Sequence, residues 1–425
     1  MESAIHEFMM KHGMHPELLD MEAHFNAFRE TMRRGLSGEP SSLMMIPSYM
    51  TLDGKITEGL STAALDAGGT NLRIGLCAAE NGTCRVVNSE LLPMLGTEER
   101  IDAPAFFAQL AKLVQPYLSN TDRLGFCFSF PAEITPDLDG IVLGFNKEVQ
   151  IDGASGAYLC RELDQALLPY GKALGCYAVV NDTVAALLGG YGSTDPDQYD
   201  GYIGMILGTG MNCCYTEHPE NIKKLSDLSG GSMIINIEAG GYDGFPVGDF
   251  DEAYDRRSAN PGDHLFEKMV SGGYLNEIAW ETICGAVEEG ILSPSVKETL
   301  SECLWTKDIC EFLLDPGTGF IHDRIAGSDD RTALYTLFDL LLDRAARLVA
   351  VSLTAIMDQG DIGKTPEKPT CIVVEGSTFQ KSPVYQQKIR RYLDEFCSNV
   401  HHRYYAFTSV KDANILGAAV AAMLR

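Results

Sequence analysis

Short apolar runs separated by turns rich in glycine begin about sixty residues into the chain. The runs Ser61 to Leu65 and Leu72 to Ala78 have the length and composition of β-strands. The residues between them include Gly68 and Gly69, and glycine takes positive φ without steric cost. The pattern therefore predicts a β-hairpin whose tight turn places Gly68 and Gly69 at positive φ.

A second pair of apolar runs lies near the middle of the chain. Tyr202 to Leu207 is followed by a turn that contains Gly208, Thr209 and Gly210, and Cys213 to Tyr215 continues on the far side. This is the pattern of the first hairpin repeated. Two such hairpins from different halves of a chain predict two related α/β domains that hold one ligand between them.

Longer amphipathic stretches predict helices at both ends of the chain and near residue 340. Met1 to Gly35 carries an apolar stripe at spacings of three and four, and Leu334 to Met357 is continuous and amphipathic. Asn414 to Leu424 is rich in alanine, and Gly417 within it permits close backbone contact. Tyr191 to Gly201 holds glycine, proline and three aspartates, so it predicts a surface loop.

The two glycine turns suggest a phosphate site. Exposed backbone N–H groups can cradle phosphate oxygens, Asp66 can hold a hydrated magnesium ion, and Thr70 can add a hydroxyl donor. An ordinary turn without a ligand is the more common interpretation of either turn taken alone. The Walker phosphate loop and the Gly-x-Gly-x-x-Gly fingerprint are both absent from the sequence. A phosphate site would therefore be built from the hairpins.

A third feature is the apolar strand Ala178 to Val180, which ends abruptly in Asn181, Asp182 and Thr183. Ligands of α/β folds bind outside the carboxyl ends of the strands, so Asp182 stands where a general base is needed. The same three residues also make a good helix N-cap. From the sequence, both interpretations remain open.

Composition limits the partners. A chain of 425 residues, 45% of them hydrophobic, predicts at least two domains with substantial cores. The net charge of −26 argues against nucleic acid and against anionic membrane surfaces. The sequence has no apolar run of membrane-spanning length and no signal-peptide pattern, so we expect a cytoplasmic protein. Twelve cysteines without a Cys-x-x-Cys pair predict free, mostly buried thiols.

Taken together and in order, the motifs from about Leu43 to the C-terminus resemble those of the hexokinase family. Residues 65–73 are similar to its phosphate motif, and residues 180–183 are similar to its catalytic strand end. Residues 374–377 are similar to its adenosine turn. The sugar-site motifs are matched by residues 124–131, 144–147, 235–238, 260–262, 265–269 and 271–275.

The resemblance implies an α/β fold of two actin-like (ribonuclease-H-like) domains around a central cleft, with helices at both termini. Residues 1–60 would form an N-terminal helix and linker packed on the large domain. Residues 61–180, completed by the C-terminal helix 413–425, would form the small domain. Residues 181–412 would form the large domain.

The resemblance also implies a reaction, which is the ATP-dependent phosphorylation of a hexose (glucose, fructose or mannose) at the 6-hydroxyl, the first step of glycolysis. Asp182 would be the general base, and sugar binding would close the domains. The partners would be hexose, ATP and Mg²⁺, the last held by Asp66 through water, in a monomer or homodimer. The sugar ligands would be Ser129, Asn146, Lys147, Asn181, Asp182, Asn212, Glu238 and Glu267. The ATP ligands would be Asp66, Gly68, Gly69, Thr70, Asn71, Arg73, Thr209, Gly210, Gly376 and Ser377.

Three positions depart from the family pattern. Ala239 stands where tryptophan is usual, Ala132 where cysteine is common, and Asn146 where threonine is usual. These departures leave the choice among glucose, fructose and mannose open. A sensor of the same fold that binds hexose and nucleotide without transferring phosphate is the alternative function. The presence of Asp182 argues against it, because a sensor needs no base at the 6-hydroxyl.

Overall fold

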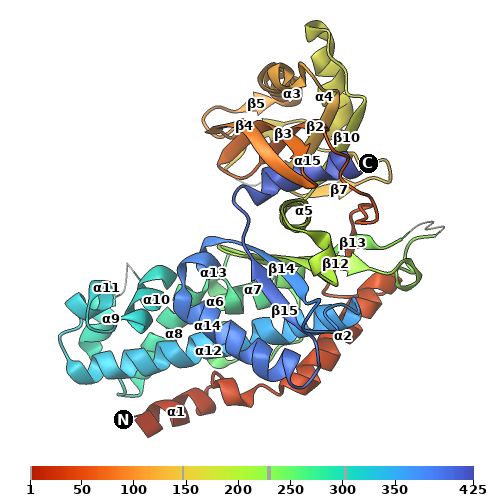
Figure 1. Ribbon diagram of the computed structural model, residues 1–425. Helices are drawn as coiled ribbons and strands as arrows, with labels where there is room; N and C mark the ends of the chain where they lie inside the picture. The colour runs from red at the N-terminus through yellow and green to blue at the C-terminus, as the bar shows by residue number, and fades with distance from the viewer. Residues whose placement is uncertain (1, 146–147, 227–230, 301–303) are drawn as a thin grey trace.

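The computed structural model describes residues 2–145, 148–226, 231–300 and 304–425. The chain forms two α/β lobes, one above the other in Figure 1, and two helices lie between their sheets. One lobe is built around a five-stranded sheet, and the other is built around a six-stranded sheet. This is the actin-like architecture expected from the sequence.

The smaller sheet has the strand order β10-β6-β2-β3-β4. The β2–β3 pair is the predicted antiparallel hairpin, and β6 runs parallel to both β2 and β10. One face of the sheet packs on two helices, and the apolar core between them includes Phe106, Phe126 and Leu163. The elements are β2 (Ser61–Ala67), β3 (Asn71–Glu80), β4 (Thr83–Pro93), β5 (Ile101–Asp102), α3 (Ala103–Val114), η2 (Gln115–Leu118), β6 (Arg123–Phe128), β7 (Ala132–Ile134), β8 (Gly140–Val142), β9 (Ile151–Asp152), α4 (Leu159–Leu167), η3 (Leu168–Tyr170) and β10 (Cys176–Val180).

The larger sheet has the strand order β1-β13-β12-β11-β14-β15. The β11–β12 pair is the second predicted hairpin, and β14 runs parallel to β11. The first elements of this large lobe are α1 (Glu2–Lys11), η1 (Pro16–Leu18), α2 (Met21–Ser37), β1 (Ile46–Pro47), η4 (Pro196–Gln198), β11 (Gly201–Leu207), β12 (Met211–Glu217), η5 (Pro219–Asn221), β13 (Met233–Asn236) and η6 (Ala239–Gly241). The remaining elements are α6 (Asp249–Arg257), α7 (Leu265–Val270), α8 (Leu275–Glu288), α9 (Pro294–Leu300), α10 (Thr306–Leu314), α11 (Gly319–Arg324), α12 (Ser328–Gln359), β14 (Thr370–Glu375), α13 (Ser377–Lys381), α14 (Pro383–Tyr392), η7 (Leu393–Ser398) and β15 (Tyr405–Thr408).

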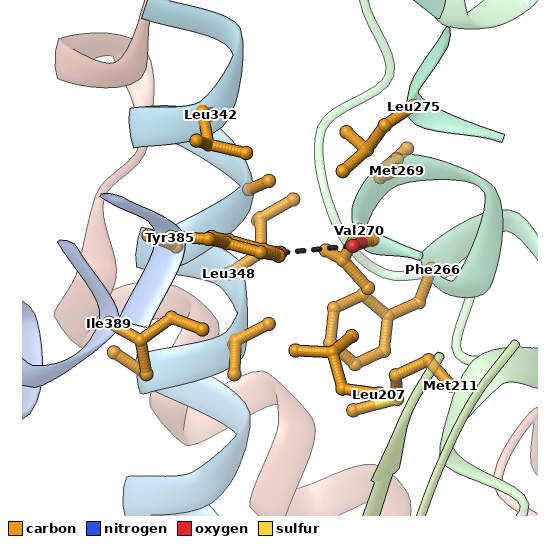
Figure 2. Close-up of a cluster of buried hydrophobic side chains, with 14 of the residues drawn as sticks. Leu207, Met211, Phe266, Met269, Val270, Leu275, Leu342, Leu348, Tyr385 and Ile389 are labelled. Atoms are coloured by element: carbon orange, nitrogen blue, oxygen red, sulfur yellow. Dashed lines mark hydrogen bonds between the residues drawn. The ribbon is translucent and has the colours of Figure 1, made fainter. Parts of the chain in front are cut away.

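A buried cluster in the large lobe supports the second hairpin directly. Leu207 and Met211, which flank the glycine turn, belong to the same core as Phe266 and Val270 of α7 (Figure 2). The buried Tyr385 of α14 donates a hydrogen bond from its hydroxyl to the Val270 carbonyl at 3.0 Å. The turn and the end of α7 therefore rest on a close-packed surface.

Two helices, α5 (Asp182–Ser193) and α15 (Ala413–Leu424), join the lobes. They pack on each other between the two sheets (Figure 1), with α15 against the small sheet and α5 against the large one. The predicted close contact at Gly417 is present, because a Cβ added there would lie 1.8 Å from the Ala185 carbonyl oxygen. The general-base candidate Asp182 thus lies at the start of a helix that both lobes contact.

Several helix boundaries differ from the prediction. The N-terminal stretch is two helices, because Gly13 takes the left-handed conformation and Pro16 starts a short 3₁₀ turn. Helix α12 begins at Ser328, where two aspartates in its first turn favour an earlier start. Helix α5 continues to Ser193, so the expected loop at 191–201 begins as helix.

Two further expectations concern cysteines and membranes. The eleven cysteines that the structure describes are free thiols, and nine of them are buried. Within the described residues, no helix has the length and apolar character needed to cross a bilayer.

Candidate active site

Three neighbouring parallel strands bring the predicted polar residues to one edge of the small sheet. In register, Asp66 of β2 pairs with Cys127 of β6, and Cys127 pairs with Val180 of β10. Ser129 follows the end of β6, and Asp182 lies two residues beyond Val180. The carboxyl ends of these strands therefore meet at one place, which is where α/β folds bind ligands.

The structure separates the two interpretations of the Asn181-Asp182 pair. Asn181 is the N-cap of α5, since its Oδ1 accepts a hydrogen bond from the Val184 N–H at 2.9 Å. Asp182 accepts from the Thr183 N–H and hydroxyl at 2.7 and 3.2 Å through one oxygen, and it lines the main cavity. Burial raises the pKa of the Asp182 carboxyl. Asn181 is therefore the residue that caps α5, and Asp182 lines the cavity.

A cavity of about 540 Å³ lies between the lobes at this edge. It brings together all six sugar-site residues that the structure describes: Ser129, Asn181, Asp182, Asn212, Glu238 and Glu267. The other two predicted ligands, Asn146 and Lys147, lie outside the described residues. A volume of this size is typical of a small-molecule site.

The large lobe forms a hydrogen-bonded polar wall of the cavity. Glu238 accepts from the side-chain amides of Asn212 and Asn236 at 3.1 and 2.6 Å. Glu267 accepts from the Met211 N–H at 2.9 Å. Asn236 was not among the predicted ligands. It lies two residues before Glu238 in the same motif, and a spacing of two along a strand places side chains on the same face.

A second unpredicted residue, His264, lines the same wall. His264 and Glu238 both take the left-handed backbone conformation, with φ of 53° and 56°. Such conformations cost roughly 1–3 kcal/mol each and cluster at functional sites. Burial raises the pKa of Glu238 and of Glu267, and the proximity of His264 opposes the rise in both. The wall therefore holds two partly buried carboxylates beside one imidazole.

The first glycine turn corrects one prediction. Neither Gly68 nor Gly69 takes the left-handed conformation. The turn closes instead through a hydrogen bond from the Gly68 N–H to the Asn71 carbonyl at 2.9 Å, and the Asn71 amide contacts the exposed Thr70 hydroxyl at 3.0 Å. Positive φ was inferred from composition alone, and this backbone path does not require it.

Asp66 and Arg73, paired in register across this hairpin, have different surroundings. Burial raises the pKa of Asp66 to about 6, and nearby Asp182 adds to the rise, while hydrogen bonds from Cys127 and from Asn414 of α15 oppose it. Arg73 forms an ion pair with Asp412, the residue before α15. The hairpin is thus linked to the C-terminal helix and to the residue before it.

The second glycine turn packs against two other chain segments, one at Gly272 and one at Gly376. Gly376, with φ of 115°, packs so closely that a Cβ would lie 2.4 Å from the Leu207 carbonyl carbon. The Gly272 N–H and the Thr378 hydroxyl both donate to the Gly208 carbonyl at 2.8 Å. The structure therefore gathers the predicted Thr209, Gly210, Gly376 and Ser377 in one region, and it adds Gly272 and Thr378. Only glycine fits the backbone path at Gly376.

Acidic residues from three chain segments lie near one another beside the end of β14. Burial raises the pKa of Glu375 to about 7, and nearby Asp412 and Asp66 raise it further. The Oε1 atom of Glu375 is buried and has no hydrogen-bond partner within the described part of the chain. Carboxylate oxygens are the preferred ligands of a hard divalent cation, so the unpartnered Glu375 oxygen and nearby Asp66 fit Mg²⁺ bound together with phosphates. Glu375 lies inside the predicted motif 374–377 but was not chosen as a ligand, because a strand-end acid is not distinctive in the sequence.

Comparison with known proteins agrees with this geometry. Two family models, both described as hexokinase, match residues 5–191 and 202–424. The chain is 32% identical to the hexokinase-like 1 protein of Arabidopsis thaliana, over 93% of this chain and 86% of the relative. It is 30% identical to hexokinase-7 of Oryza sativa subsp. japonica, over 92% and 90%.

The fold is also shared with a solved structure. A solved structure of hexokinase from Schistosoma mansoni complexed with glucose matches with a TM-score of 0.76 at 24% identity, covering 100% of this chain and 99% of that one. Both family models and both relatives therefore lead to one conclusion: the chain belongs to the hexokinase family.

Proposed function

We propose that the protein transfers the γ-phosphoryl group of ATP to the 6-hydroxyl of a hexose, giving hexose 6-phosphate and ADP. The observation that carries the proposal is the position of Asp182, a carboxylate just beyond a strand end that lines one cavity together with five other predicted sugar ligands. Phosphoryl transfer depends on positioning, on charge neutralisation and on a base for the attacking hydroxyl. Asp182 supplies the base, which a sensor of the same fold does not need.

The sugar would be held by hydroxyl-binding groups from both lobes. Ser129 lies on the small-lobe side, and Asn212, Glu238 and Glu267 form the large-lobe wall. Hydroxyls both donate and accept, so amides and ionised carboxylates are suitable partners. Asn146 and Lys147 remain predictions from the family motif. Which hexose is preferred depends on details of this wall, and glucose, fructose and mannose are all candidates.

The nucleotide would lie between the two glycine turns. The Gly68 and Gly208 N–H groups close the two turns, so other backbone N–H groups of these turns, such as those of Gly69, Thr70, Thr209 and Gly210, would contact phosphate oxygens. The turn at Gly376 and Ser377 would lie near the adenosine. Asp66 would hold Mg²⁺ through water. When bound, the ion would neutralise negative charge on the β- and γ-phosphates. Glu375 lies close enough to Asp66 to share this electrostatic environment.

A coupled assay for hexose 6-phosphate tests the function directly. Glucose, fructose and mannose are each supplied with ATP and with other phosphate donors, and Asp182→Ala protein serves as the blank. Formation of hexose 6-phosphate with one sugar well above this blank supports the proposal. Saturable hexose and nucleotide binding without any product would identify the sensor instead.

As the pH is lowered, hexose affinity is expected to begin to fall while the pH is still above 4.5, the ordinary pKa of glutamate. Burial raises the pKa of both Glu238 and Glu267, so each carboxylate gains its proton at a higher pH than usual as the pH is lowered. A protonated carboxyl is a weaker acceptor for sugar hydroxyls. Calorimetry from pH 8 downward measures the effect.

Glu238→Gln is the matched control for this pH dependence. It should weaken binding by about ten- to hundredfold at neutral pH, the usual value of hydrogen bonds to a charged group. It should also make the remaining affinity less dependent on pH. An unchanged pH profile in this variant would show that other groups control hexose binding.

Asp66→Asn should reduce transfer and weaken the response to magnesium by about 10- to 100-fold, the range found for groups that support a metal indirectly. The amide keeps the shape of the side chain and removes the charge. Hexose affinity should change little, because Asp66 is not among the residues lining the main cavity. Calorimetry with sugar and with magnesium–nucleotide measures the two affinities separately. Parallel loss of both affinities would show that the hairpin is only structural.

Hexose binding should also draw the lobes together, because Ser129 and the Glu238 wall belong to different lobes and a sugar must contact both. Small-angle scattering at saturating hexose should then give a smaller radius of gyration. An identical scattering profile with and without sugar would contradict closure.

A further inference from the structure

A second cavity lies on the large lobe, where α13 and α14 meet the edge strand β15 (Figure 1). Its volume is about 420 Å³, and no described residue lines both this cavity and the main one. Its described lining residues are Val374, Phe379, Gln380, Gln386, Arg390, Phe407, Thr408 and Ser409. None of these eight is an acid or a histidine, so the cavity is suited to binding a ligand and not to acid–base chemistry.

The floor of this cavity is apolar. Val374 and Phe379 are 1% and 5% exposed, and both belong to the core of the large lobe. The Phe379 ring lies 5.0 Å from the partly buried Phe407 ring, at an angle of 50°. Two aromatic rings beside a valine offer an apolar surface that suits an aromatic part of a ligand.

The rim of the cavity carries a cation without an acidic partner. Lys388 and Arg391 of α14 both form ion pairs with Asp343. Arg390 of the same helix makes no ion pair or side-chain hydrogen bond with any residue that the structure describes, and its guanidinium lies 4.7 Å from the centre of the Phe407 ring. A guanidinium can bind a carboxylate or phosphate group through two parallel hydrogen bonds. Arg390 therefore offers this cavity an anion-binding group.

Two glutamines and a serine complete the rim. The Gln380 side-chain amide donates to the Ser409 hydroxyl at 3.0 Å and to the Val374 carbonyl at 3.4 Å. The Gln386 amide donates to the carbonyls of Phe379 and Gln380 at 2.7 and 3.4 Å. These bonds use both hydrogens of each amide, so the two amide oxygens are left to accept from a ligand. The Ser409 hydroxyl accepts from Gln380 and is left with its own proton to donate.

We propose that this cavity binds a small organic anion, an aromatic ring that carries a carboxylate or a phosphate group. The oxyanion would contact Arg390 and Ser409, and the ring would cover Phe379 and Phe407. A volume of this size accommodates such a compound. The inference goes beyond the proposed function and does not depend on it, because the two cavities have no described residue in common.

The cavity is also distinct from the predicted nucleotide site, although α13 takes part in both. The Thr378 hydroxyl of this helix donates to a carbonyl of the second glycine turn at 2.8 Å. Gly376 and Ser377, the predicted adenosine turn, do not line the cavity, whereas Phe379 and Gln380 do. A ligand in the cavity and a nucleotide in the cleft would therefore contact different residues of one short helix.

Ligand-observed saturation-transfer NMR tests the assignment with phenyl phosphate and benzoate, one probe for each anionic group. At least one should bind, and the tighter of the two shows which oxyanion the site prefers. Inorganic phosphate lacks the ring and benzyl alcohol lacks the charge, so each should compete at least about tenfold more weakly. Failure of both aromatic anions to bind, or equal competition by inorganic phosphate or benzyl alcohol, would overturn the proposal.

Arg390→Gln should weaken binding of the aromatic anion by about ten- to hundredfold, the usual value of hydrogen bonds to a charged group. Arg324→Gln is the matched control and should leave the affinity unchanged. The Arg324 guanidinium also lies over a phenylalanine ring, 3.9 Å from the centre of Phe320, but Arg324 does not line the cavity. Equal affinities in the two variants would show that the probe binds elsewhere and would refute the site.

Protection of an introduced thiol locates the probe by a second measurement. Ser409→Cys places a thiol at the exposed rim, and nine of the eleven native cysteines that the structure describes are buried. Iodoacetamide should label this thiol several-fold more slowly when the aromatic anion is saturating, with the parent chain as the control for native thiols. An unchanged labelling rate would contradict the site. The measurement needs no kinase activity, so its result stands whether or not hexose 6-phosphate is formed.

Discussion

Replacement of Asp182 by alanine is expected to lower kcat for hexose phosphorylation by about 100- to 10,000-fold, the usual contribution of a general base. Asp182 lies at a strand end, lines the cavity and is oriented by the Thr183 N–H and hydroxyl. Without its carboxylate, no side chain at this position can accept the proton of the 6-hydroxyl as it attacks phosphorus. Hexose binding should largely remain, because Ser129, Asn212, Glu238 and Glu267 still line the cavity.

Asp182→Asn is the matched variant, since it keeps the size of the side chain and removes only the basic oxygen. It should lose turnover to a similar extent, with hexose affinity measured by calorimetry close to that of the parent. Turnover within a few-fold of the parent in either variant would assign Asp182 to helix structure and refute the mechanism. Asn181 already serves as the cap of α5, so a structural role for Asp182 is not needed.

Local patterns predicted the hairpins and the strand end because each is encoded in a few consecutive residues. The apolar runs on either side of the turns at Gly68 and at Gly208 indicate strand pairs from a few residues alone. The order of motifs then placed Glu238 and Glu267 in one site with Asp182, although 85 residues separate the first and the last of them in the sequence. That inference came from the family resemblance, since spacing alone does not specify a contact between lobes.

Features set by long-range contacts were not predictable in the same way. The electrostatic environment of Asp66 depends on Asn414 and Cys127, and the raised pKa of Glu375 depends on Asp412 and Asp66. The backbone at His264 and Glu238 is left-handed although neither residue is glycine, so composition gives no sign of it. The φ values of Gly68 and Gly69 were predicted wrongly for the converse reason, because glycine permits positive φ without requiring it.

The sequence predicted only that Gly417 permits close backbone contact, and the structure shows that this contact joins α5 and α15. Disrupting the contact should have a large effect on stability. Gly417→Val should reduce stability by about 3 kcal/mol or more, at the upper end of the range for overpacking. The added Cβ would lie 1.8 Å from the Ala185 carbonyl oxygen, which is backbone and has no rotamer to change. The two helices must then separate, and the separation displaces the helix that begins at Asp182.

Thermal unfolding and hexose kinase activity together measure this effect. Gly417→Val should lower the apparent melting temperature by several degrees and reduce activity in the protein that remains folded. Gly417→Ala should have a smaller effect of the same sign, since better helix propensity offsets part of the clash. Gly317→Ala is the control, because a Cβ there meets only the Asp315 carboxylate at 3.4 Å, an ordinary contact in an exposed turn. If Gly417→Val unfolded at the same temperature as the control, the helices would not pack as closely as the structure places them, and the junction would not be what fixes Asp182 relative to both lobes.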